Sequence, residues 1–78
     1  MTQSEGTPST QELVLVASVR VSVAKSAEAA LNRAQIDFTG SVGRGVEGLY
    51  VSKSDLARAK TVLKDDAQAH QYKIDIAD

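Results

Sequence analysis

The chain has 78 residues, of which nine are basic and ten acidic, so its formal charge is −1. This length suffices for one small domain and excludes a second hydrophobic core. The near-neutral charge provides no long-range attraction to nucleic acid or to an anionic membrane, and we expect neither as a partner. Cysteine is absent, which excludes disulfides, thiolate metal sites and a cysteine nucleophile. No apolar run approaches the ~18 residues that a membrane-spanning helix requires.

Residues 1–11, MTQSEGTPSTQ, are mostly polar and show no apolar periodicity. Such a segment buries too little surface to offset the entropy lost on ordering. We therefore predict a disordered tail over 1–11 and a single folded domain over 12–78. The tail also lacks the basic and apolar regions of a secretory signal peptide, and a cytoplasmic location is the default expectation.

The first half of the domain predicts a strand followed by a helix. In residues 12–19, ELVLVASV, both alternating faces are mostly apolar, which favours a central strand. The helix-facing side would consist of Leu13, Leu15, Ala17 and Val19, and the open side of Val14, Val16 and Ser18. Apolar residues at helical spacing then predict a helix over 23–35, with Ser22 as its N-cap.

A glycine-rich hairpin follows. Residues 36–42 and 46–51 alternate apolar and polar side chains, and four of the five glycines lie between 40 and 48. The simplest explanation is a wide or bulged turn in which glycine permits positive φ angles and close backbone approach. The alternative is an anion-binding concavity, in which backbone N–H groups and a cation hold a phosphate or carboxylate. Its residues would be Gly43, Arg44 and Gly45.

The second half of the domain repeats the pattern of helix and strand. Ser52 and Asp55 fit a capping box, followed by a helix to about Ala69 and a closing strand over 72–77. The order strand–helix–strand–strand–helix–strand predicts an α+β, ferredoxin-like βαββαβ fold. In that fold a four-stranded antiparallel sheet of order 4-1-3-2 carries both helices on one face, and the first and third strands are central.

The sequence contains residues and motifs typical of catalysis or cofactor binding, but the elements and residues around them do not fit these functions. Residues 43–48 match G-x-G-x-x-G but lead into a strand, whereas a dinucleotide site needs a helix there. His70 has no second ligand or base at useful spacing. Asp65 and Asp66 are adjacent on a helix and are interpreted as surface charge. Ser41 has no general base near it in sequence. We therefore expect no enzyme, no catalytic residue, no metal site and no cofactor.

The predicted open face of the sheet brings Val14, Val16 and Tyr50 together. Because a small core gains from additional burial, one interpretation is a homodimer that buries these three side chains. RNA-binding sheets of this topology stack bases on two or three aromatic residues, and here only Tyr50 is available, so RNA binding is disfavoured. The remaining alternative is a mildly apolar exposed face without a partner.

The runs 27–42, AEAALNRAQIDFTGSV, and 48–63, GLYVSKSDLARAKTVL, resemble a family of small bacterial domains described as signal-transducing proteins, whose own function is unassigned. That family shows a helix ending in Leu…Ala-Gly-Ile, a hairpin, and Val-Pro-Glu-Glu-Asp…Ala…Leu at the second helix. Here Gln35 replaces the glycine and Ser52 the proline. The resemblance covers about residues 13–63.

The resemblance implies a ferredoxin-like fold similar to that of the P-II nitrogen regulators, in which the loop between the second and third strands contacts partners and effectors. By that likeness Gly43, Arg44 and Gly45 would form the binding end. We accordingly expect a non-enzymatic regulatory or signal-transducing domain that binds a small anionic effector or a protein partner through its glycine-rich turn. A structural or assembly module that dimerises through its sheet face is the alternative.

Overall fold

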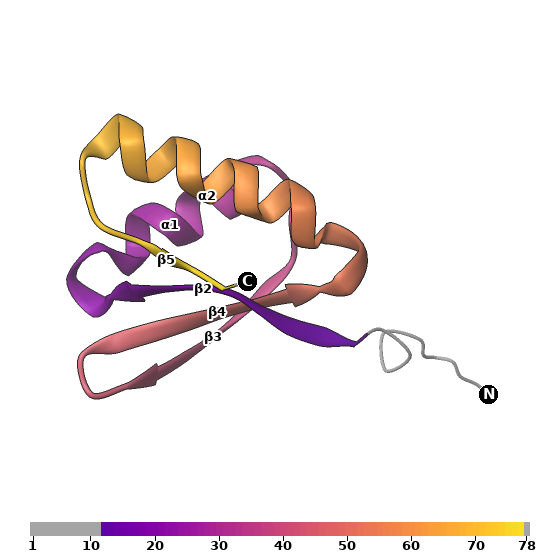
Figure 1. Cartoon of the computed structure of the whole chain (residues 1–78), viewed down its shortest axis with the longest axis horizontal. Coiled ribbons are helices and arrows are strands. Elements are labelled where there is room, and N and C mark those ends of the chain that lie inside the picture. Colours follow the sequence, from indigo (N-terminus) through magenta and orange to yellow (C-terminus); the bar gives the residue numbers. More distant parts are fainter. Residues whose placement is uncertain (1–11, 78) are drawn as a thin grey trace.

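The computed structural model describes residues 12–77, so the tail predicted over 1–11 lies outside the described residues (Figure 1). The elements in chain order are β2 (Leu13–Arg20), α1 (Val21–Arg33), β3 (Phe38–Gly43), β4 (Val46–Ser52), the 3-10 turn η2 (Lys53–Asp55), α2 (Leu56–His70) and β5 (Asp75–Ile76). This order confirms the α+β class, the four-stranded antiparallel sheet and the two helices. The architecture is consistent with a ferredoxin-like fold.

The strands are arranged β3-β4-β2-β5 across the sheet. In chain order this arrangement is 2-3-1-4 counted from the β3 edge and 4-1-3-2 counted from the β5 edge. Strands β2 and β4 are therefore central, and β3 and β5 are the edges. Both helices lie on the same side of the sheet, and its other face is open (Figure 1).

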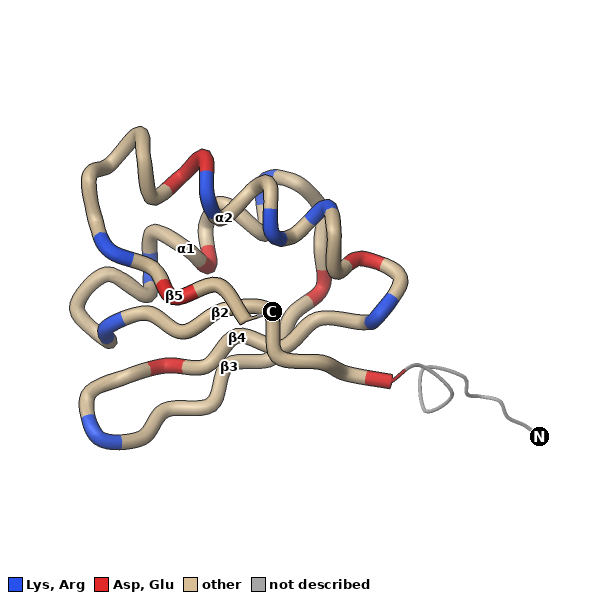
Figure 2. Tube along the Cα trace, viewed as in Figure 1, with Lys and Arg blue, Asp and Glu red and all other residues tan. Residues whose placement is uncertain are grey.

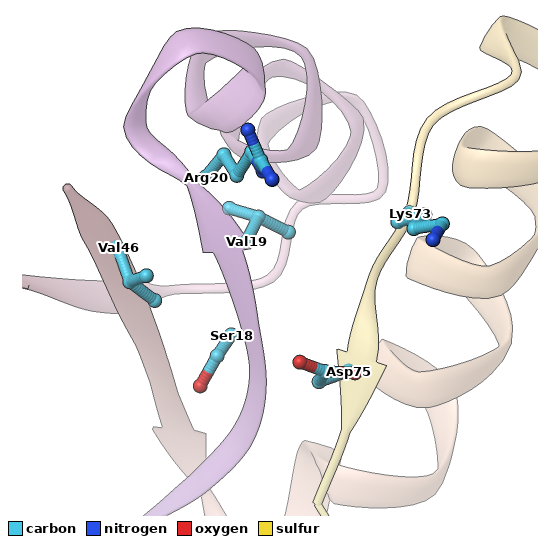
Figure 3. A pocket seen from close by; sticks show the side chains of 6 residues that line it. All are labelled: Ser18, Val19, Arg20, Val46, Lys73 and Asp75. Carbon is cyan, nitrogen blue, oxygen red and sulfur yellow. The ribbon is translucent and has the colours of Figure 1, made fainter.

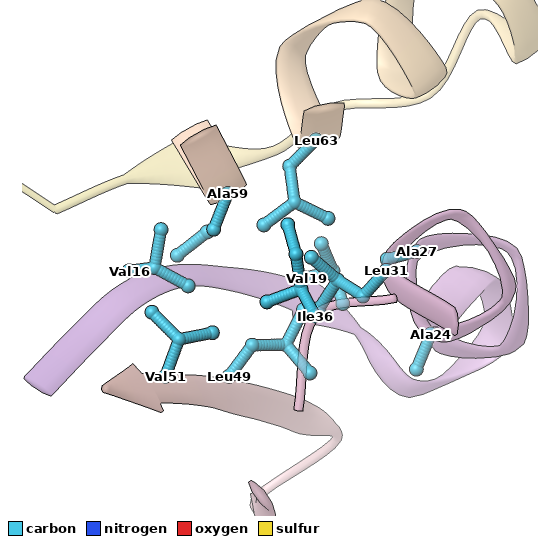
Figure 4. Close-up of a cluster of buried hydrophobic side chains, with 11 residues drawn as sticks. Val16, Val19, Ala24, Ala27, Leu31, Ile36, Leu49, Val51, Ala59 and Leu63 are labelled. Atoms are coloured by element: carbon cyan, nitrogen blue, oxygen red, sulfur yellow. The ribbon is translucent and has the colours of Figure 1, made fainter. Parts of the chain in front are cut away.

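The core lies between the helices and the sheet (Figure 4). Its largest fully buried side chains are Leu31, Ile36, Leu49, Leu63, Val16 and Val51. Helix α1 contributes small side chains, with Ala24 and Ala27 at 3% and 0% exposure. Alanine lets this helix approach the sheet closely, while the larger apolar residues supply most of the stabilisation, at roughly 1.5–3 kcal/mol for each buried Leu, Ile or Val.

Strand β2 contains a β-bulge. Its pairing with β4 shifts register between Leu15 and Ala17, which leaves Val16 without a direct partner. Because one extra residue inverts the alternation of side chains, Val16 and Ala17 are both buried under the helices. The predicted faces are therefore wrong on the N-terminal side of the bulge. Leu13 and Leu15 were expected in the core, but they are 54% and 38% exposed, and Leu15 lies opposite Tyr50.

Neither predicted side-chain cap forms. Helix α1 begins at Val21, before the expected cap Ser22, and the Val21 N–H donates to the Gly45 carbonyl at 2.9 Å. A backbone acceptor on the neighbouring hairpin thus replaces a capping hydroxyl. Ser52 bonds to the side chain of Asp55 at 3.3 Å and caps no backbone N–H.

Strand β5 is shorter than predicted. It spans Asp75–Ile76, which pair with Ser18 and Ala17, instead of residues 72–77. The side chain of Tyr72 turns toward α2, where its hydroxyl is bonded to Asp66. Neither helix within residues 12–77 has the length and apolar character needed to cross a membrane.

Candidate functional site

The predicted binding residues Gly43, Arg44 and Gly45 form the tip of the β3–β4 hairpin. Arg44 and Gly45 alone separate the two strands, with φ angles of 54° and 80°. Two positive φ angles are the pattern of a type I′ turn, whose twist matches that of the flanking strands. The prediction of a wide or bulged turn is therefore wrong, because the hairpin is tight and only two residues separate its strands. All three residues are exposed.

A hollow adjoins this turn on the open face of the sheet (Figure 3). Its volume is about 360 Å³, and it is lined by Ser18, Val19, Arg20, Val46, Lys73 and Asp75. Strand pairing brings these residues together, because Arg20 lies opposite Val46 and Ser18 lies opposite Asp75. Val46 also pairs with Gly43, so the hollow and the predicted turn share one strand pair.

The charges around the hollow are two cations, Arg20 and Lys73, and one carboxylate, Asp75. Figure 3 shows Arg20 at the end of β2 and Lys73 on the segment that leads into β5, on either side of the hollow. Arg44 lies at the adjoining turn, which the bond between Val21 and Gly45 holds beside the start of α1. The hollow and the adjoining turn thus have three cations and one carboxylate, in a chain whose net charge is −1.

The predicted dimer residues Val14, Val16 and Tyr50 do not form one patch. Val16 is fully buried under the helices, which contradicts its assignment to the open face. Val14 lies opposite the buried Val51 and therefore also belongs to the helix-facing side. Tyr50 is half-buried on the open face, where Leu15 lies opposite it. The physical reason is the β-bulge, which places Leu15 instead of Val16 on the open face.

A polar cluster that the sequence analysis missed surrounds Asp66, whose side chain is only 4% exposed. Tyr72 and Ser26 donate hydroxyl hydrogen bonds to its Oδ2 at 2.6 Å and 2.9 Å. His70 Nδ1 lies 3.0 Å and Arg33 Nη2 3.5 Å from its Oδ1. Asp66 was expected at the surface, but it joins α1, α2 and the segment before β5.

The helical spacing contained a signal for this burial. Asp66 follows the buried Ala59 and Leu63 by seven and three residues, which places it on the same stripe of α2. Burial by itself would raise the pKa of Asp66, but the hydrogen bonds from Tyr72 and Ser26 and the nearby His70 and Arg33 hold it below its usual value. The carboxylate therefore stays charged while buried.

The geometry of the cluster favours a structural role. Burial and the bond to Asp66 raise the pKa of the Tyr72 hydroxyl, which makes that hydroxyl a poorer source of a nucleophile. Ser26 also donates to the carboxylate and has no bond to His70 among the described contacts. A hydroxyl nucleophile needs a base that takes up its proton, and the lowered pKa of Asp66 makes this carboxylate a weak base. The cluster thus provides the buried Asp66 carboxylate with hydrogen bonds and positive charges from three segments of the chain.

A second acidic site lies between α1 and the sheet. Glu47, on β4, is 6% exposed and faces Glu28 of α1. The hydrogen bond with Glu28, burial and the repulsion between the two carboxylates raise the pKa of Glu47 to about 7. Gly40 makes room for this carboxyl, because a Cβ at position 40 would overlap Glu47 Oε2. Within residues 12–77, no group of three or more His, Cys, Asp or Glu residues is placed to hold a metal ion.

No protein-family model, curated protein or solved structure matched the chain in comparisons with known proteins. The family resemblance of residues 27–42 and 48–63 therefore stays a prediction, and a function has to be inferred from the residues of the site itself.

Proposed function

We propose that the domain is a non-enzymatic regulatory module that binds a small anionic effector in the hollow beside the β3–β4 turn. The observation that carries the proposal is the placement of Arg20 and Lys73 around one hollow of about 360 Å³. They come from opposite ends of the folded chain, and the pairing of β5 with β2 brings them together. A cytoplasmic, signal-transducing role is part of the same proposal.

The residues of the hollow suit a carboxylate or a phosphate. An arginine presents several donors in a planar fork that matches either anion, and a lysine adds a compact positive charge. Ser18 offers a hydroxyl, and Asp75 would accept a hydrogen bond from an ammonium or hydroxyl group on the same ligand. The volume lies at the lower end of the ~300–1,000 Å³ typical of small-molecule sites, so a metabolite-sized ligand fits best.

The turn predicted as the binding element would contribute indirectly. Val46 lines the hollow and pairs with Gly43, so a bound ligand would lie next to the turn. Arg44 is exposed there and would increase the local positive potential that attracts an anion. This assigns Arg44 to attraction of the ligand and Arg20 and Lys73 to its direct contacts.

The test is a titration of the isotope-labelled domain, followed by amide chemical shifts. The panel contains nucleotides, phosphate metabolites and amino acids. We expect saturable shifts at residues 18–20, 46 and 73–75 for at least one anionic compound. Arg20→Glu and Lys73→Glu should each weaken binding at least tenfold, and Arg44→Glu by less. Lys64→Glu makes the same charge change on an exposed residue of α2, on the other side of the sheet, and is the matched control.

Two results would refute the proposal. One is the absence of saturable shifts with every compound of the panel. The other is binding that Arg20→Glu and Lys73→Glu leave unchanged, since the ligand would then occupy a different surface. If Arg44→Glu alone abolished binding, the contacts would belong to the turn itself, as the sequence suggested.

The open sheet face favours a second candidate, an assembly module. Leu13 and Leu15 are 54% and 38% exposed, and Leu15 lies opposite Tyr50. These side chains would gain burial against a partner protein or another copy. Tyr50→Asp should then reduce the molecular mass measured by light scattering, whereas a dimer or complex of unchanged mass would count against this candidate.

A further inference from the structure

The edge strand β3 is unusually well suited to pair with another strand. All six residues of β3 pair with β4 in continuous register, and its other edge has no strand partner in the sheet. Figure 1 shows β3 along the lower edge of the sheet, with no described element beyond it. Its outward backbone N–H and C=O groups are therefore available for a further ladder of hydrogen bonds.

Strand β3 also lacks the features that normally protect an edge. Its sequence, FTGSVG, contains no charged residue and no proline, and its pairing with β4 shows no bulge. Figure 2 shows the same strand free of charged positions between the charges that flank it. The opposite edge, β5, is only two residues long, contains Asp75 and is preceded by Lys73. Short and charged edges resist pairing, so the two edges of this sheet differ.

We propose that two copies of the chain pair through β3, antiparallel, around a two-fold axis at Gly40. The pairing would create one continuous eight-stranded sheet with all four helices on the same side. This interface is separate from the hollow, and the inference does not depend on the effector proposal.

The side chains of β3 are complementary to themselves in this register. Phe38 and Val42 both lie on the helix-facing side, because they pair with the buried residues Val51 and Glu47. With Gly40 opposite its own copy, each Phe38 would lie opposite the second copy's Val42. Val42 is 64% exposed in the single chain, so the contact would cover the most exposed large apolar residue among those described. Aromatic and β-branched side chains are favourable cross-strand partners.

The flanking charges select the antiparallel orientation. Asp37 immediately precedes β3, and Arg44 immediately follows it. In this antiparallel register Asp37 would lie opposite the second copy's Gly43, one residue from its Arg44, whereas parallel pairing would bring like charges together. On the open side, Thr39 would lie opposite the second copy's Ser41, and both hydroxyl groups tolerate solvent there.

The proposal is tested by sedimentation equilibrium of the whole chain over micromolar to millimolar concentrations. We expect a reversible dimer that Val42→Lys weakens at least tenfold, since a lysine would then lie against Phe38. Val21→Lys makes the same change at another exposed valine, 43% exposed at the start of α1, and should leave the dimer unchanged.

A charge exchange provides a second test that does not affect the apolar contact. Asp37→Arg should weaken the dimer by about threefold to tenfold, because it places two arginines together. The double variant Asp37→Arg with Arg44→Asp should restore the original affinity. A chain that stays monomeric at millimolar concentration would overturn the proposal. A dimer that neither Val42→Lys nor Asp37→Arg weakens would place the interface on another surface and would equally overturn it.

Discussion

The unfolding free energy of the domain should fall as the pH rises through neutrality, and replacing Glu47 by glutamine should prevent this fall. Glu47 is buried beside Glu28, and its pKa is raised from 4.5 to about 7. The folded protein therefore binds this proton more tightly than the unfolded chain. Its contribution to stability is complete below the unfolded pKa of 4.5 and is lost as the pH rises through about 7.

The size of the effect follows from the two pKa values. A tenfold difference in proton affinity corresponds to about 1.4 kcal/mol, so a pKa that moves from 4.5 to about 7 changes the unfolding free energy by at most about 3.5 kcal/mol. Movement of the half-buried Glu28 toward water would reduce this figure. For a domain of this size, even about 2 kcal/mol shifts the melting temperature by roughly 10 °C.

The assay is urea unfolding at several values between about pH 5 and about pH 8, followed by circular dichroism. In Glu47→Gln the amide donates to Glu28 as the protonated carboxyl does, and it cannot ionise. The variant should therefore match the original protein at the acidic end and exceed its stability at the basic end. Asp65→Asn, an exposed position on α2, controls for the loss of one negative charge. The reasoning is refuted if Glu47→Gln keeps the same dependence on pH as the original protein.

Three further substitutions test other parts of the structure. Tyr72→Phe removes the 2.6 Å hydrogen bond to the buried Asp66 carboxylate and should lower the unfolding free energy by about 1.5–3 kcal/mol. Gln35→Gly should raise it by about 0.5–1 kcal/mol, because Gln35 has a φ of 60° that glycine adopts without strain. Gly40→Ala displaces the Glu47 carboxyl and should cost about 1–3 kcal/mol, whereas Gly43→Ala meets no atom within 4 Å and should cost less than about 0.5 kcal/mol.

Each of these is checked by denaturant unfolding against a matched variant. Tyr50→Phe controls for Tyr72→Phe, since the Tyr50 hydroxyl makes no hydrogen bond within the described part of the chain. Gln68→Gly controls for Gln35→Gly, because glycine inside α2 should instead destabilise by about 1 kcal/mol. Equal effects of Tyr72→Phe and Tyr50→Phe, or of the two glycine substitutions, would contradict the structural argument.

The order of elements could be predicted from the sequence because it depends on local periodicity. Apolar residues at helical spacing and at alternate positions specify which segments are helices and which are strands, and chirality then leaves few topologies. The unpredicted caps show the limit of this reasoning. The start of α1 depends on the Gly45 carbonyl, an acceptor more than twenty residues away that no local pattern reveals.

The buried acids were only partly predictable. Glu47 alternates with the core residues Leu49 and Val51, and Asp66 lies on the apolar stripe of α2, so both positions contained a signal. The sequence contained no signal for the partners of these acids, because Glu28, Ser26 and Tyr72 approach them only through tertiary packing. The hollow could not be predicted for the same reason. It joins residues 18–20, 46 and 73–75, whose proximity depends on the pairing of β2 with both β4 and β5.

The bulge in β2 gives the clearest contrast between the sequence prediction and the structure, and two truncations distinguish them. The alternating pattern placed Leu15 in the core and Val16 on the open face, whereas the structure leaves Leu15 38% exposed and Val16 fully buried. Val16→Ala removes two buried carbon groups and leaves a cavity, which should cost about 2–3 kcal/mol.

Leu15→Ala removes more atoms, but from a partly exposed side chain, and should cost about 1 kcal/mol or less. Chemical unfolding of both variants at low protein concentration measures the difference without a contribution from association. If Leu15→Ala cost more than Val16→Ala, strand β2 would keep a regular alternation without the bulge. Leu13 and Leu15 would then face the helices, and Val14 and Val16 would lie on the open sheet face beside Tyr50, as the alternating pattern predicted.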